Sequence, residues 1–163
     1  MIDPREQWLS VYERENATTL KVMRAYPLDR ADFKPHPISG SAQQLMWTFA
    51  IEQSVLKGAL DGTLTMPPKF PDQPSTMAEV IAHWQKGTGE VAALMRASPE
   101  AKLGSSITFF TGPGTLSQVP LMQVLWLMLL DSIHHRGQLS VYLRMVGGKG
   151  PSIYGPSHAE PWM

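Results

Sequence analysis

Residues 119–148 read VPLMQVLWLMLLDSIHHRGQLSVYLRMVGG, and this stretch decides the fold. Pro120 suits the start of a helix, and Gly147 and Gly148 suit its end. Positions 124–130 are apolar on every side. We therefore expect this helix to be buried on more than one face, inside a helical bundle and also against a second copy of the chain.

Three further segments carry the start and stop signals of helices. Asp3, Ser41 and Thr76 can each cap a helix, and a Glu or Gln stands three residues after each of them. Pro27 ends the first segment, and Gly62 ends the second. The expected helices cover about residues 4–26, 41–61, 76–97 and 119–146.

The connections between the helices differ in character. The segment 66–74 contains four prolines in nine residues, so we expect a long surface crossover there. Residues 104–116 combine some β character with a Gly-Pro-Gly turn and predict at most a short hairpin or an extended loop. The tail 147–163 is irregular, but its apolar residues lead us to expect that it packs on the bundle.

Composition limits the class of protein. The chain has 163 residues, which suits a single domain over 1–163. Equal numbers of acidic and basic residues give no electrostatic reason to expect nucleic acid or an anionic membrane as partner. With no cysteine, disulfides and thiolate chemistry of the chain itself are excluded. No apolar run is long enough for a membrane span or a signal peptide, so we expect a cytoplasmic protein.

Asp131 and His135 are the clearest candidates for a functional site. They lie one turn apart on the same face of the last helix, and Val124 and Gln138 border that face, so we expect it to point inward. A carboxylate in an apolar interior costs several kcal/mol unless it is paired or bound to a cation. Two interpretations stay open: a structural Asp–His hydrogen bond, or two ligands of a metal ion.

A metal site needs a third ligand from another helix, and Glu52 is the best candidate. It lies one turn after Thr48 on the second helix. A set of Glu, Asp and His would suit a divalent ion of zinc, nickel, manganese or iron. His83 is a further candidate. The other histidines are expected at the surface, and His134 points about 100° away from His135.

Three segments resemble a known family. The motif HHRGQL at 134–139, with YLR at 142–144, is similar to the last-helix signature of the DinB-like superfamily. The segment SAQQLMWTFA at 41–50 and the tail segment PSIYGP at 151–156 also resemble its members. The resemblance implies an all-α, up-down-down-up four-helix bundle, often dimeric. Its long connection lies between the second and third helices, where this chain has the proline-rich segment.

The resemblance also implies a site that this chain has altered. Family members often bind a divalent metal through three histidines, and the matching positions here are Thr48, Asp131 and His135. Only His135 keeps the family ligand. Either the site has been rebuilt with Glu52, or the metal has been lost and a pocket lined by Thr48 and Gln138 remains.

The function expected from the sequence follows these two alternatives. One is a homodimeric bundle that binds a small molecule or has a structural role, with or without a metal. The other is a metal-dependent enzyme, either a thiol-dependent S-transferase or a hydrolase. The sequence leaves open whether the protein is an enzyme, and nothing in these residues implies DNA binding.

Overall fold

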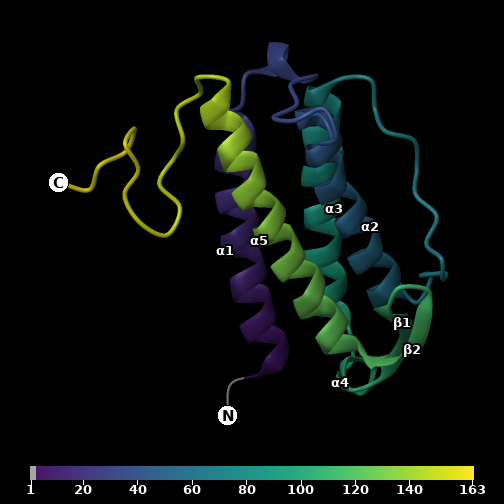
Figure 1. Ribbon diagram of the computed structural model, residues 1–163. Coiled ribbons are helices and arrows are strands. Elements are labelled where there is room, and N and C mark those ends of the chain that lie inside the picture. Colours follow the sequence, from purple (N-terminus) through teal and green to yellow (C-terminus); the bar gives the residue numbers. More distant parts are fainter. Residues whose placement is uncertain (1–2) are drawn as a thin grey trace.

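Four long helices lie side by side in the computed structural model, which describes residues 3–163. Residues 1 and 2 of the expected domain lie outside the described part. The helices are α1 (Pro4–Ala25), α2 (Ala42–Asp61), α3 (Met77–Ala97) and α5 (Leu121–Met145). Figure 1 shows α1 and α5 running in one direction and α2 and α3 in the other. The all-α, up-down-down-up bundle is confirmed.

The helices begin where the capping residues predict. The Asp3 side chain accepts a hydrogen bond from the backbone N–H of Arg5. Ser41 and Thr76 each form a complete capping box with the residue three positions later. Gly62, with a φ of 84°, ends α2 in the left-handed conformation that glycine adopts without strain.

The connections add small elements around these four helices. A 3-10 turn (Leu28–Arg30) follows α1, and the short helix α4 (Glu100–Leu103) follows α3. Strands β1 (Ser106–Gly112) and β2 (Thr115–Pro120) form an antiparallel hairpin at one end of the bundle. The hairpin extends to Pro120, so α5 begins at Leu121 and not at the expected residue 119. The backbone of Pro120 lies opposite Ser106 in the strand ladder, and this pairing sets the boundary.

Helix packing places two seams on opposite sides of the bundle. Helix α2 packs against α3 and α5, and α1 packs against α5 and α3. The α2–α5 seam and the α1–α3 seam therefore do not share a helix. Buried aromatic side chains hold the interior together, among them Trp8, Trp84, Tyr12 and Phe49.

Helix α5 is only partly enclosed by the other helices of the chain. Leu125 and Leu129 are buried, but Leu127 and Leu130 are 47% and 59% exposed. Helix α5 packs against both α1 and α2, and the expected contact with a second copy of the chain stays a prediction. Seven consecutive apolar residues surround a helix, whereas the neighbouring helices of the same chain cover only part of it. No helix in the range 3–163 has the length and apolarity needed to cross a membrane.

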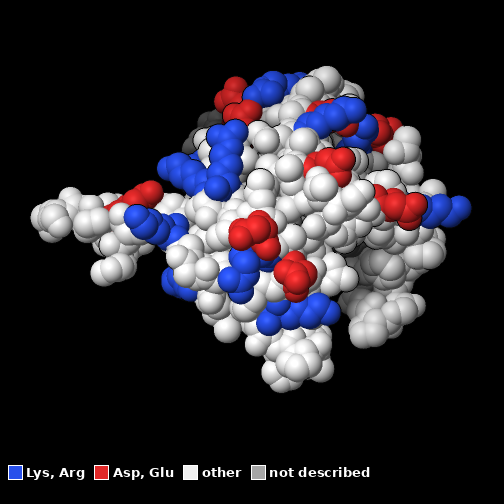
Figure 2. All heavy atoms as spheres, turned by 90° about the horizontal axis from the view of Figure 1, so that it is seen from above, with Lys and Arg blue, Asp and Glu red and all other residues white. Residues whose placement is uncertain are grey.

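The C-terminal tail is attached to the bundle at its beginning and extends away at its end. Ile153 packs against the core, and the Tyr154 hydroxyl contacts Glu15 of α1. Beyond this point the tail leaves the bundle, as Figures 1 and 2 show, and Trp162 is mostly exposed. The expected packing holds only for the first part of the tail. Figure 2 also shows acidic and basic side chains interspersed on this end of the molecule.

Candidate metal centre

The α2–α5 seam brings together Glu52, Asp131 and His135. Glu52 lies in the middle of α2, and the other two lie one turn apart on α5. Each side chain offers one ligand atom, and these atoms all lie within 4.8 Å of one another. The three residues singled out as metal ligands in the sequence are thus neighbours in space.

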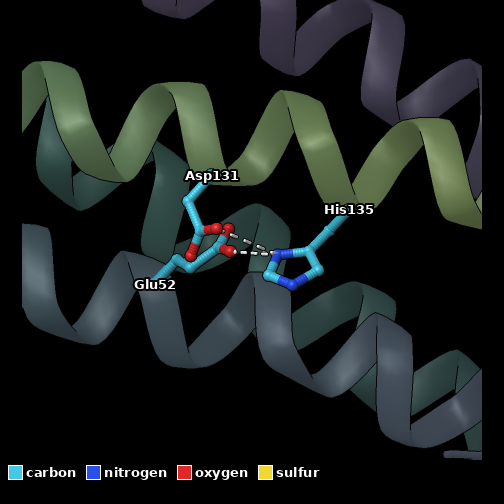
Figure 3. A group of neighbouring side chains, drawn as sticks. All are labelled: Glu52, Asp131 and His135. Atoms are coloured by element: carbon cyan, nitrogen blue, oxygen red, sulfur yellow. Dashed lines mark hydrogen bonds and ion pairs between the residues drawn. The ribbon is translucent and has the colours of Figure 1, made fainter. Parts of the chain in front are cut away.

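The imidazole of His135 is the centre of this group. Its Nδ1 atom lies 2.7 Å from Oε1 of Glu52 and 4.0 Å from Oδ1 of Asp131. Both contacts end on the same nitrogen, as Figure 3 shows. His135 therefore pairs with Glu52 across the seam more closely than with Asp131 on its own helix.

Burial differs sharply between the two carboxylates. Glu52 is 3% exposed, whereas the Asp131 side chain is 44% exposed. The expectation that Asp131 enters the apolar interior is therefore wrong. Asp131 therefore lies at the rim of the seam, whereas the His135 side chain is 19% exposed. Glu52 is the carboxylate that carries the cost of burial.

The protonation behaviour of the pair follows from this burial. Burial raises the pKa of the Glu52 carboxyl above its ordinary value, although the nearby His135 and Ser132 side chains oppose the rise. The hydrogen bond with Glu52 raises the pKa of His135, although burial opposes that rise. Each group thus holds a proton more readily than it would in water.

One oxygen of Glu52 has no partner. Its Oε2 atom is buried and accepts no hydrogen bond from any residue that the structure describes, and the same holds for the Ser132 hydroxyl. A buried carboxylate oxygen is normally satisfied by a donor or a cation. Ser132 is a nearby donor, since its side chain also opposes the rise in the Glu52 pKa. Glu52 therefore has one oxygen that contacts His135 and a second that Ser132 or a bound cation can satisfy.

The three side chains fit a divalent metal ion. Ligand atoms at about 2.0–2.2 Å from a metal stand about 3–3.5 Å apart. The separations of 2.7 Å and 4.0 Å from the His135 Nδ1 atom lie on either side of this range, so small side-chain rotations would satisfy it. Two carboxylates and one imidazole suit zinc, iron or manganese better than the softest metals.

The two residues expected to line the pocket do not join the group. Thr48 lies one turn before Glu52, and its hydroxyl donates to the Gln44 carbonyl oxygen of its own helix. The Gln138 side chain is exposed and contacts His134 at 2.9 Å. Neither forms a hydrogen bond with the three candidate ligands among the interactions described.

The remaining histidines lie elsewhere. His83 packs edge-on against Trp47, with 5.2 Å between the ring centroids. His36 and His158 are exposed in loops, as expected. Only His135 among the five histidines joins a cluster of ligand groups in the described chain.

Sequence reasoning missed a buried ion pair beside the site. A positive residue late in a helix suits the helix dipole and needs no partner, but Arg136 is 1% exposed. It donates to Oε2 and to the backbone oxygen of Glu15 at 2.8 Å and 3.0 Å. Tyr154 of the tail donates to the same carboxylate at 2.5 Å. Arg136 lies seven residues, or about two helical turns, after buried Leu129. This spacing alone indicates that the two residues share the inward face of the helix.

Comparison with solved structures shows the same fold in three proteins of low sequence identity. The DinB-like protein YjoA from Bacillus subtilis is 19% identical, with 96% of this chain and 99% of that chain covered and a TM-score of 0.69. A DinB-like protein from Bacillus cereus is 18% identical, with 91% and 97% covered and a TM-score of 0.76.

The third structure is YfiT from Bacillus subtilis, described as a probable metal-dependent hydrolase with an unusual four-helix bundle topology. It is 17% identical, with 88% of this chain and 87% of that chain covered and a TM-score of 0.68. No curated protein sequence matches the chain. The sequence profile of the DinB family matches residues 1–162, and the chain therefore belongs to the DinB family.

Proposed function

We propose that this protein binds a divalent metal ion through Glu52, Asp131 and His135 and uses the site for hydrolysis. The observation that carries the proposal is the placement of three ligand atoms, one from each residue, within 4.8 Å of one another, with two of them on the buried side of the seam. A buried carboxylate costs free energy unless a donor or a cation joins it. The description of YfiT as a probable metal-dependent hydrolase supports the same chemistry.

The proposal interprets the altered ligand set as a rebuilt site. Thr48 stands where the family resemblance places a histidine, and Glu52 lies one turn further along the same helix. Its side chain reaches the imidazole across the seam, so it can supply the ligand that Thr48 lacks. His135 would bind through Nδ1, which requires the neutral imidazole.

The donor set favours hydrolysis over thiol transfer. A divalent ion in such a site supplies Lewis-acid activation of water at neutral pH. Two anionic carboxylates would neutralise most of the charge of a bound divalent ion, whereas neutral histidines would not. A site with two carboxylates therefore attracts a thiolate cofactor less strongly. Asp131 is the most exposed of the three groups, so it lies where a substrate would enter and where a proton can pass to solvent.

A metal-free structural pair is the second candidate. The observation that favours it is the 2.7 Å contact between His135 and Glu52, because a shared proton can satisfy both groups. In that case the bundle is a binding or structural protein. The two candidates differ in whether the purified protein contains metal.

Elemental analysis tests this difference. Protein purified without added metal should contain close to one divalent ion per chain and should hydrolyse p-nitrophenyl esters in a metal-dependent way. Glu52→Gln and His135→Gln should lose most of the metal, whereas the control His83→Gln should keep it. Metal-free wild-type protein that also binds no added zinc or manganese would support the structural pair. Metal retained in both site variants would refute the proposed ligands.

We also propose that the chain forms a homodimer through the exposed face of α5. Leu127, Leu130, Val141 and Met145 are 45–59% exposed and fall within about 60° of one another around the helix. Exposed His134 and Gln138 lie between the two apolar pairs on this face. Exposed apolar groups of this kind are unfavourable in water and are typical of an interface. Asp131 borders this face at about 40°, so a second copy would lie beside the open side of the metal centre.

Sedimentation velocity tests the dimer. Leu130→Glu should convert the protein to a monomer, because it places a charge at the most exposed apolar residue of this face. Leu116→Glu is the matched control, since Leu116 is 43% exposed on β2, outside this face. A wild-type monomer at micromolar concentration, or a dimer that Leu130→Glu leaves intact, would contradict the proposed interface. The cytoplasmic location and the lack of nucleic-acid partners stay predictions.

A further inference from the structure

Among the long helices of residues 3–163, only α5 exposes large apolar side chains. These are Leu127, Leu130, Val141 and Met145, and we call the face that they form the α5 face. Figure 1 shows α5 running along the front of the bundle. Its other sides pack against α1 and α2. The α5 face therefore has no covering helix within the described chain.

The α5 face carries no Lys, Arg, Asp or Glu. Between its two apolar pairs lie His134, Gly137 and Gln138, which are all exposed and form the polar centre of the face. Asp131 and Arg144 stand about 40° outside it, one at each edge. A strongly acidic or basic partner would find no opposite charge here, whereas a second copy of the chain presents the same uncharged face.

The order of residues along the α5 face is nearly symmetric about the level of residue 136. Leu127 and Met145 lie nine residues before and after this level, and Leu130 and Val141 lie six before and five after it. When the face is turned end over end, apolar groups meet apolar groups and the polar centre meets itself. A two-fold interface between identical chains requires this kind of self-complementary surface.

Gly137 in the polar centre indicates the close approach of another helix. It lies inside α5 and is exposed, and a Cβ atom added to it would meet no other atom within 4 Å. Glycine inside a helix lowers stability relative to alanine, and no contact within the described chain requires it at this position. Two helices that cross at Gly137 can approach closely, because no side chain separates their backbones there. Gly89 of α3 is also exposed, but no exposed large apolar residue accompanies it on that helix.

We propose that two copies of the chain pack α5 against α5 in opposite directions, about a two-fold axis at the level of residue 136. The Leu127–Leu130 pair of each copy would then contact the Val141–Met145 pair of the other. The α5 face extends over about 27 Å, so the two helices must be nearly aligned, with a crossing angle near about 20°. The inference rests on the proposed homodimer and adds its geometry.

This arrangement brings the second copy to the entrance of the metal centre. Asp131 lies five residues before the axis, so Val141 of the partner subunit stands at its level. The axes of two packed helices are about 8–10 Å apart. The exposed rim at Asp131 is therefore flanked by the partner, and one wall of the entrance comes from the second copy.

Disulfide cross-linking tests this geometry, and the chain has no cysteine of its own to interfere. Leu130→Cys and Val141→Cys proteins, mixed in equal amounts under reducing conditions and then oxidised, should form a covalent dimer. The two positions stand at nearly the same level, within the roughly 7 Å that a disulfide can span between Cα atoms. In either variant alone, the two cysteines would lie about 15–18 Å apart along the helices and should not link.

A parallel pair of helices would give the reverse pattern, because each position would then face its own copy. Self-linking of both single variants, or a dimer in sedimentation velocity whose mixture does not link, would overturn the geometry while leaving the homodimer intact. A wild-type monomer would instead refute the homodimer itself. Leu116→Cys mixed with Val141→Cys is the matched control and should stay unlinked, since Leu116 lies on β2.

Gly137→Leu tests the crossing point. A leucine between the two backbones should raise the dimer dissociation constant about tenfold or more in sedimentation velocity. Gly89→Leu, at the exposed glycine of α3, should leave it unchanged. In the monomeric Leu130→Glu background, Gly137→Leu should raise the melting temperature, because leucine favours a helix more than glycine does. An unchanged dimer, or a lower melting temperature in the monomer, would refute the assigned role of Gly137 and with it the crossing point.

Discussion

Glu15→Gln tests whether the buried ion pair between α1 and α5 stabilises the bundle. The side chains of Glu15 and Arg136 are 4% and 2% exposed, so neither charge has water to replace its partner. Removing one partner from such a pair costs about 3–5 kcal/mol, because the other charge stays buried and uncompensated. Arg136 keeps its bond to the Glu15 backbone oxygen, so we expect the lower end, about 3 kcal/mol.

Thermal and urea unfolding followed by circular dichroism measure this loss. For a chain of this size, about 3 kcal/mol corresponds to a fall of about 6–12 °C in melting temperature. Glu13→Gln is the matched control. It lies two residues away, and its ion pair with Arg96 is about half exposed on both sides, so its removal should cost less than about 1 kcal/mol.

A double-mutant cycle with Arg136→Met decides whether the loss belongs to the pair. Once both charges are gone, no uncompensated charge remains, so the double variant should be more stable than the sum of the single effects by about 2 kcal/mol or more. Additivity within about 0.5 kcal/mol would refute the reasoning. Tyr154→Phe removes one donor to the same carboxylate and should cost about 1 kcal/mol.

The remaining predictions concern pH and the backbone. Burial alone would raise the pKa of Glu15, but hydrogen bonds from Tyr154 and Arg136 outweigh it and hold the pKa below its ordinary value. The Glu15 contribution is therefore present above the unfolded-state pKa and lost as pH falls through the folded-state value, so the stability difference between wild type and Glu15→Gln should shrink below about pH 4 in acid titrations. Ser41→Ala removes half of a capping box and should cost about 1 kcal/mol in urea unfolding, and a loss below about 0.3 kcal/mol would contradict the role of the cap. Gly148→Ala should destabilise, since its Cβ atom would lie 2.1 Å from Cδ1 and 3.0 Å from the backbone oxygen of buried Leu143, whereas Gly150→Ala meets no atom within 4 Å and should be neutral in the same assay.

The sequence predicts the elements of this fold better than their mutual contacts. Local signals act within one turn, so the caps at Ser41 and Thr76 could be found from a few neighbouring residues. The start of α5 depends on a strand pairing between residues 106 and 120, which no local signal contains. The sequence therefore predicts the start of α5 two residues too early.

For the candidate site, too, the sequence predicts what lies on one helix better than what depends on contacts between helices. Spacing on one helix placed Asp131 and His135 on one face, and chemistry suggested Glu52 as their partner on the second helix. Which carboxylate is buried depends on how far α2 overlaps α5, and no single helix encodes that. The pairing of Arg136 with Glu15 and Tyr154 joins three segments that are distant in sequence, so it became visible only in the assembled bundle.

The crossover between α2 and α3 determines which of two bundle architectures this chain can adopt. Helix α2 has 20 residues and is about 30 Å long, and the chain must travel this length to begin α3 at the same end. The segment 62–76 has about 15 residues and spans at most about 50 Å when extended, so it has limited slack. Deleting roughly half of it would make the parallel arrangement of α2 and α3 unreachable and would leave only an antiparallel return. The length of this one loop, more than any buried contact, acts as the topological switch between the two bundle types.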